Sequence, residues 1–158
     1  MFFGTTYTLV HVFLSLIAIA SGIVVAYGLV NAKRFNRWTV LFLVTTLATN
    51  LTAFGFALAS SPGDKIAMIS IGVLLVASVA RYDCELDGPC RWIYVITAMM
   101  ALYLNVFVLI LHAFQKVSTL KALAPTGYEL PFLIAQEIIL VLFVWLTVVA
   151  VKRFRSAT

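Results

Sequence analysis

Long apolar runs without charges alternate along this chain with short segments that carry nearly all of the charged residues. Residues 6–30, 38–60 and 92–114 contain no Asp, Glu, Lys or Arg, and residues 131–151 contain a single one, Glu137. A helix rises 1.5 Å per residue, so each run is long enough to cross a hydrocarbon core of about 30 Å. The pattern therefore predicts at least four transmembrane helices.

The run between Lys65 and Arg81 is shorter, and it decides the number of crossings. Residues 66–80 cross the membrane only if both flanking cations extend their side chains to the interfaces. The alternative is a re-entrant or interfacial segment, which leaves four spans. Five spans with an outside N-terminus put eight Lys and Arg residues in the cytoplasm and three outside, whereas four spans give five and six. The cytoplasmic set for five spans is Lys33, Arg34, Arg37, Arg81, Arg91, Lys152, Arg153 and Arg155. The positive-inside bias favours five spans.

Composition agrees with a membrane protein. Hydrophobic residues make up 63% of the chain and charged residues 11%, whereas charged residues are about a quarter of a soluble protein. The net charge of +5 comes mainly from cations at span ends, which sets orientation and does not indicate nucleic-acid binding. We predict one all-α domain, residues 1–158: a five-transmembrane-helix bundle with short loops, an outside N-terminus and a cytoplasmic C-terminus.

The first span contains Ala18, Ile19 and Ala20, which resemble a signal-peptide cleavage site. However, no basic segment precedes the apolar run, and the run is longer than the 7–15 residues of a signal peptide. We therefore expect the first span to be retained.

Polar side chains inside the spans are the candidates for function, because a carboxylate in hydrocarbon costs several kcal/mol. The candidate ligand-binding residues are His11, Asn105, His112, Gln136 and Glu137. In the five-span topology His11 and Glu137 lie roughly 8 and 9 Å below the outer boundary, and Asn105 shares a helix face with His112. All five are predicted in the outer half of the membrane.

Three functions of different classes fit this set. The first is a non-enzymatic module that binds a small ligand, lipid or ion in an outer-leaflet pocket. The second is an accessory or structural subunit of a larger membrane complex, with the polar residues as interhelical hydrogen bonds. The third is a redox protein, either with a b-type haem between His11 and His112 or with a divalent metal on these two histidines and Glu137. A proton-linked pair of Glu137 and His11 is a further hypothesis. In the alternative reading, both histidines are interfacial residues near span ends.

No phosphate-binding glycine loop, His-Glu-x-x-His helix or nucleophile elbow occurs in the sequence. The absence of these motifs favours a non-enzymatic role. The expected partners are the lipid bilayer and a second copy or a larger membrane complex.

Small and hydroxylated residues form stripes on the first two spans, which is typical of helices that pack closely in membranes. The stripes are Ser15, Ala18 and Gly22 on the first span and Thr45, Thr49, Thr52 and Gly55 on the second. These stripes predict that the two spans pack together with His11 facing the bundle interior.

Two loops carry further features. Cys84 and Cys90 lie in a loop expected in the cytoplasm, where thiols stay reduced, and their spacing fits no standard zinc pattern. Residues 116–124 have apolar positions at helical spacing before Pro125, which predicts a short interfacial helix.

Four short motifs in the C-terminal half carry a resemblance. They are Arg-Trp-Ile-Tyr-Val at 91–95, Leu-Tyr-Leu-Asn-Val-Phe-Val at 102–108, Leu-Lys-Ala-Leu-Ala-Pro at 120–125 and Pro-Phe-Leu-Ile-Ala-Gln at 131–136. The region 91–136 resembles a family of small uncharacterised bacterial inner-membrane proteins. The resemblance implies a multi-pass protein of the bacterial cytoplasmic membrane and assigns no functional residue.

Overall fold

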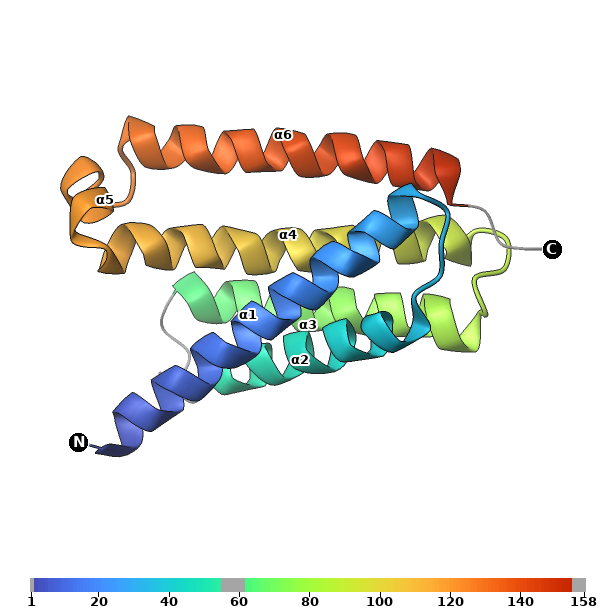
Figure 1. Cartoon of the computed structure of the whole chain (residues 1–158), viewed down its shortest axis with the longest axis horizontal. Coiled ribbons are helices and arrows are strands. Elements are labelled where there is room, and N and C mark those ends of the chain that lie inside the picture. The colour runs from blue at the N-terminus through green and yellow to red at the C-terminus, as the bar shows by residue number, and fades with distance from the viewer. Residues whose placement is uncertain (1, 55–61, 155–158) are drawn as a thin grey trace.

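The computed structural model describes residues 2–54 and 62–154, and within these residues all regular structure is helical (Figure 1). The elements are α1 (Phe2–Val30), α2 (Asn36–Phe54), α3 (Pro62–Ser78), the π-helical turn η1 (Val79–Asp83), α4 (Cys90–Lys116), α5 (Ser118–Leu123) and α6 (Leu130–Arg153). The prediction of an all-α protein is confirmed. The short α5 falls within the segment 116–124 for which an interfacial helix is expected.

Helix α4 organises the bundle, because α1, α3 and α6 all pack against it. Its buried face includes Tyr94, Val95, Ala98 and Met99, which belong to the main hydrophobic core. Helix α1 also packs against α2, and α2 against α3. Helix α6 lies at the edge of the bundle beside α4 (Figure 1) and leaves most of its apolar surface exposed.

Four helices among the described residues are long and apolar enough to cross a membrane. They cover Leu9–Val30, Lys65–Asp83, Cys90–Lys116 and Leu130–Arg153. The short third run is among them because its helix continues through η1, which brings it to 19 residues. The predicted second span, 38–60, is described only as far as Phe54, where α2 ends, and residues 55–61 lie outside the described part of the chain.

Arg81 corrects one detail of the sequence-based expectation. Its side chain does not extend outward from the end of the third span but is only 9% exposed. The π-helical turn η1 contains Arg81, and its guanidinium packs over the ring of Tyr94 of α4 at 5.0 Å.

Segments that are distant in sequence meet at one end of the bundle, which we call the basic end. Arg81 of η1 donates a hydrogen bond to Asn36 at the start of α2. Arg91 at the start of α4 donates to the carbonyl of Phe154, just after α6, at 2.6 Å. The basic end comprises Lys33, Arg34, Arg37, Arg81, Arg91, Lys152 and Arg153. Figure 1 shows these segments together at the right of the bundle, opposite the α4–α5–α6 connection.

Candidate functional site

The small-residue stripe of α1 faces its neighbouring helices. Ala18 is fully buried. A Cβ added at Gly22 would lie 2.5 Å from Leu102 of α4 and 2.8 Å from Phe42 of α2, so only glycine permits this approach. Ser15 is half-buried and donates a hydrogen bond to the carbonyl of His11 at 2.9 Å.

The hydroxylated stripe of α2 is mostly buried. Thr45 and Thr49 are each 7% exposed. Their hydroxyls donate to carbonyls of their own helix, Thr45 to Leu41 at 2.7 Å and Thr49 to Thr45 at 2.8 Å. Gly55 lies outside the described residues.

His11 joins α1 to α2 through a side-chain hydrogen bond. Its Nδ1 lies 2.8 Å from Thr52 Oγ1, and Thr52 Oγ1 donates its hydrogen to the carbonyl of Thr49 at 2.8 Å. The Nδ1–H of His11 is therefore the donor in this contact. His112 and Lys116 of α4 are close enough to act electrostatically on His11. Both histidines are half-buried.

Asn105 lies inside the bundle and not in an open pocket. It is 8% exposed, and its Nδ2 donates to Thr46 Oγ1 of α2 at 3.1 Å. Asn50 of α2 makes a similar bond to Ser70 of α3 at 2.8 Å. Such bonds hold membrane helices together, because hydrocarbon offers polar groups no alternative partner.

Gln136 and Glu137 face different surroundings although they are neighbours on α6. Gln136 is 8% exposed, and its Nε2 donates to the carbonyl of Phe107 on α4 at 3.2 Å. Its Oε1 is buried and accepts no hydrogen bond. Glu137 is exposed on the outer surface of the bundle.

An open hollow of about 540 Å³ lies between α4 and α6 and contains both of these residues. It is lined by Tyr103, Leu133, Ile134, Gln136, Glu137 and Leu140. Two of the residues expected from the sequence are thus combined with a tyrosine from α4 on a surface that is otherwise apolar.

The predicted set of five polar residues therefore divides into separate places. His11 is hydrogen-bonded to Thr52 of α2, His112 lies on α4, Asn105 is a packing residue, and Gln136 and Glu137 line the α4–α6 hollow. In residues 2–54 and 62–154, no three His, Cys, Asp or Glu side chains could hold a metal ion together. The described structure thus does not assemble the metal site of His11, His112 and Glu137.

Two residues of interest were not singled out from the sequence. Tyr103 was missed because nothing in the local sequence gives the register between α4 and α6. Arg81 was considered only as a flanking cation, although a helix that continues past it would place it within the span.

No family model, curated protein or solved structure matches this chain. The chemistry of the side chains is therefore the basis for assigning a function.

Proposed function

We propose that this chain is a small, non-enzymatic, multi-pass protein of the bacterial inner membrane that binds a hydrophobic primary amine in the hollow between α4 and α6. The observation that carries the proposal is the exposed carboxylate of Glu137, which follows Gln136, a residue whose buried Oε1 has no hydrogen-bond partner. Both line the same hollow.

Glu137 specifies what the ligand must supply. An ionised carboxylate accepts hydrogen bonds and donates none, so the ligand must bring donors. A primary ammonium has three N–H donors and a charge opposite to that of Glu137, and charge-assisted bonds of this kind are about twice as strong as neutral ones. Leu133, Ile134 and Leu140 provide apolar surface for an alkyl chain.

The position of Glu137 within α6 makes its carboxylate energetically unfavourable when no ligand is bound. The residue lies about two turns into α6, a helix long and apolar enough to span the membrane. A carboxylate at such depth costs several kcal/mol unless a partner neutralises it. A bound ammonium would remove that cost.

Exposure of α6 also supports a second candidate function, docking as an accessory subunit. In its most apolar stretch only 11% of α6 is buried, against 39% for α4. A partner helix that carries a lysine or a hydroxyl would satisfy Glu137 in the same way as a free amine.

Binding of dodecylamine to the purified protein in nanodiscs, measured by native mass spectrometry, tests the amine proposal. Dodecyltrimethylammonium is the matched ligand, because it has the same charge and chain length but no N–H donor. Since hydrogen bonds to charged groups contribute about 1.5–3 kcal/mol, we expect dodecylamine to bind about tenfold more tightly or better.

Two variants locate the site. Glu137→Gln should abolish the preference for dodecylamine, whereas Glu85→Gln, which removes a carboxylate from an exposed loop at the basic end, should preserve it. Equal binding of both ligands to the unaltered protein, or an unchanged preference in Glu137→Gln, would refute the proposal. If Glu137→Gln instead abolishes only a cross-link from α6 to another membrane protein, the accessory role is the correct one.

We also propose five membrane crossings with the N-terminus outside. In the described residues, seven Lys and Arg lie at the basic end, and the positive-inside bias then assigns that end to the cytoplasm. Cys84 and Cys90 are the chain's two cysteines; Cys84 lies in the loop at that end, and Cys90 is the first residue of α4. A membrane-impermeant maleimide should label them only after the inner membrane is permeabilised. Labelling in intact spheroplasts would show that the basic end lies outside, which contradicts the proposed orientation.

A further inference from the structure

A buried arginine without a carboxylate partner lies at the basic end. Arg81 is 9% exposed, and its Nε is buried without a hydrogen-bond acceptor. Its Nη2 donates to Asn36 Oδ1, and its guanidinium lies over the rings of Tyr94 at 5.0 Å and Tyr82 at 5.7 Å. Within the described residues no carboxylate forms an ion pair with it.

These contacts do not balance the charge. An amide oxygen and two aromatic faces compensate a guanidinium only in part, because a buried charge normally needs an opposite charge and complete hydrogen bonding. An anion from outside the chain would supply both. The π-helical turn that holds Arg81 fits this view, since such turns occur frequently at functional sites.

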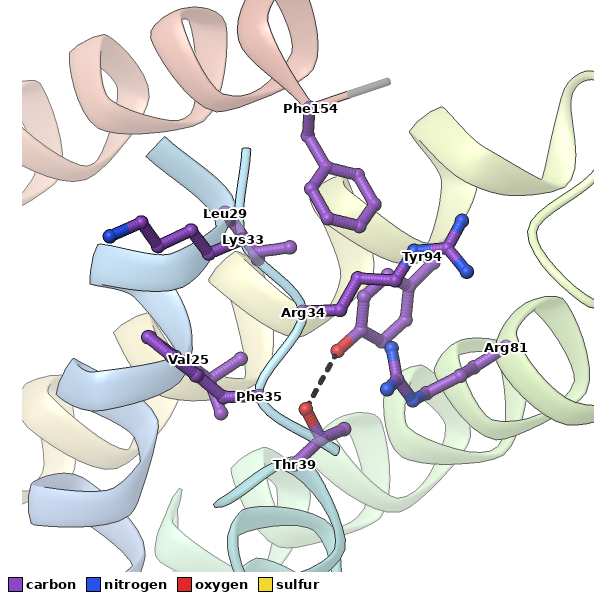
Figure 2. Close-up of a pocket in the computed structure, with 9 residues that line it drawn as sticks. All are labelled: Val25, Leu29, Lys33, Arg34, Phe35, Thr39, Arg81, Tyr94 and Phe154. Atoms are coloured by element: carbon purple, nitrogen blue, oxygen red, sulfur yellow. Dashed lines mark hydrogen bonds between the residues drawn. The ribbon is translucent and has the colours of Figure 1, made fainter. Parts of the chain in front are cut away.

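Arg81 lies on a narrow cleft between the α1–α2 linker and the end of α6 (Figure 2). Lys33 and Arg34 of the linker, Thr39 of α2 and Phe154 after α6 also line it. Figure 2 shows the Thr39 hydroxyl in contact with that of Tyr94, at 3.4 Å. The cleft has about 180 Å³ of empty space, in a form too narrow to admit a water molecule.

Arg34 also lines this cleft. The residue is exposed, and its guanidinium lies 5.9 Å from the ring of Phe154. This cation–π contact is weak at an exposed site, about 0.5–1 kcal/mol. Rotation of the Arg34 side chain away from Phe154 therefore costs little.

The α1–α2 linker has a defined backbone conformation at the point where it leaves α1. Ala32 adopts a left-handed conformation with φ 55°, and the backbone N–H of Lys33 donates to the carbonyl of Gly28 at 2.8 Å. This is a Schellman helix end, which reverses the chain. A Cβ at Gly28 would lie 2.9 Å from the carbonyl oxygen of Lys33, so glycine permits the close return.

We propose that this cleft binds a phosphate group. Arg81 would donate from the base of the cleft through Nε, and Arg34 from its mouth after leaving Phe154. Arginine suits this role because its planar donors match two phosphate oxygens at once. The phosphate belongs either to the headgroup of an anionic lipid or to a small soluble anion. The site is independent of the α4–α6 hollow, because it takes a ligand of opposite charge at another part of the bundle.

Thermal unfolding in detergent at constant ionic strength tests the proposal, because a ligand that binds only the folded state raises the unfolding temperature. The probes are dioctanoyl phosphatidic acid and inorganic phosphate, each titrated separately, with sodium chloride as the reference anion. Stabilisation by phosphatidic acid alone assigns the site to a lipid headgroup. Stabilisation by inorganic phosphate, with competition against phosphatidic acid, assigns it to a soluble anion.

Variants separate a defined site from general attraction to positive charge. Arg34→Ala should weaken apparent phosphate or phosphatidic acid binding by about tenfold, as expected for the loss of one charge-assisted donor. Arg37→Ala is the matched control, because Arg37 is an exposed cation nearby that does not line the cleft, and it should bind as the unaltered protein does. Lack of stabilisation by either probe would overturn the proposal, as would equal losses in the two variants.

Discussion

Replacing Gly22 by alanine is the sharpest test of how the bundle is packed. The new Cβ would lie 2.5 Å from Leu102 Cδ1 and 2.8 and 2.9 Å from Phe42 Cε2 and Cδ2. Leu102 is 2% exposed and Phe42 1% exposed, so neither side chain can move into open space. Overpacking of this kind costs about 1–3 kcal/mol, and the higher helix propensity of alanine recovers about 1 kcal/mol at most. After this recovery, we expect Gly22→Ala to lower the free energy of unfolding by about 0–2 kcal/mol.

Gly72 offers a matched control on α3, because a Cβ there meets no atom within 4 Å. Gly72→Ala gains helix propensity without a clash and should be neutral or stabilising by up to about 1 kcal/mol. Unfolding in mixed detergent micelles with increasing SDS, followed by circular dichroism, gives both free energies. If Gly22→Ala proves as stable as Gly72→Ala, α1 does not make the close contact with α2 and α4 described above.

Three further predictions concern other regions. Asn105→Leu removes the bond to the buried Thr46 and should cost about 1 kcal/mol in the same unfolding assay without affecting dodecylamine binding; loss of amine binding would instead make Asn105 part of the ligand site. The backbone N–H of Thr126 holds the pKa of the Glu129 carboxyl below its usual value. This hydrogen bond stabilises the conformation of the α5–α6 linker. The stabilisation should therefore be complete above the usual glutamate pKa and be lost as pH falls through the lowered pKa. Hydrogen exchange of the linker amides should show this change, and Glu129→Gln should remove it. Finally, the Cys84 and Cys90 side chains contact each other, so diamide should join them by a disulfide, measured as loss of maleimide labelling that a reductant restores.

Element positions follow well from the sequence, because apolar runs bounded by charges measure the length of a membrane helix directly. The third run illustrates the limit of that rule. Its helix ends at Asp83 and not before Arg81, because the π-helical turn takes the arginine into the bundle. A count of uncharged residues treats every charge as a boundary and cannot show that one of them is buried.

The direction in which each polar side chain points, toward a neighbouring helix or toward the outside, was much harder to predict. In a soluble helix the polar side marks the surface, but lipid is as apolar as the core, so a membrane helix need not show such a side. In the first half of helix α6, Gln136 and Glu137 are the polar residues, and they are neighbours in the sequence. The sequence could not tell that Gln136 faces α4 while Glu137 faces outward. The outer-leaflet pocket expected to combine Glu137 with the two histidines depended on that direction.

The outward-facing Glu137 and the buried Arg81 both affect the stability of the folded chain. Neither Glu137 nor Arg81 forms an ion pair within the described residues, and both lie in helices long and apolar enough to span the membrane. Each charge raises the free energy of the folded chain when it has no partner. A ligand or protein that binds to the charge therefore stabilises the folded state. A ligand present at one hundred times its dissociation constant contributes about 2.7 kcal/mol, which is a large part of the usual stability of a domain, about 5–15 kcal/mol. The stability of this protein should therefore depend on what surrounds it, falling in a neutral detergent and rising when amines or phosphates are supplied.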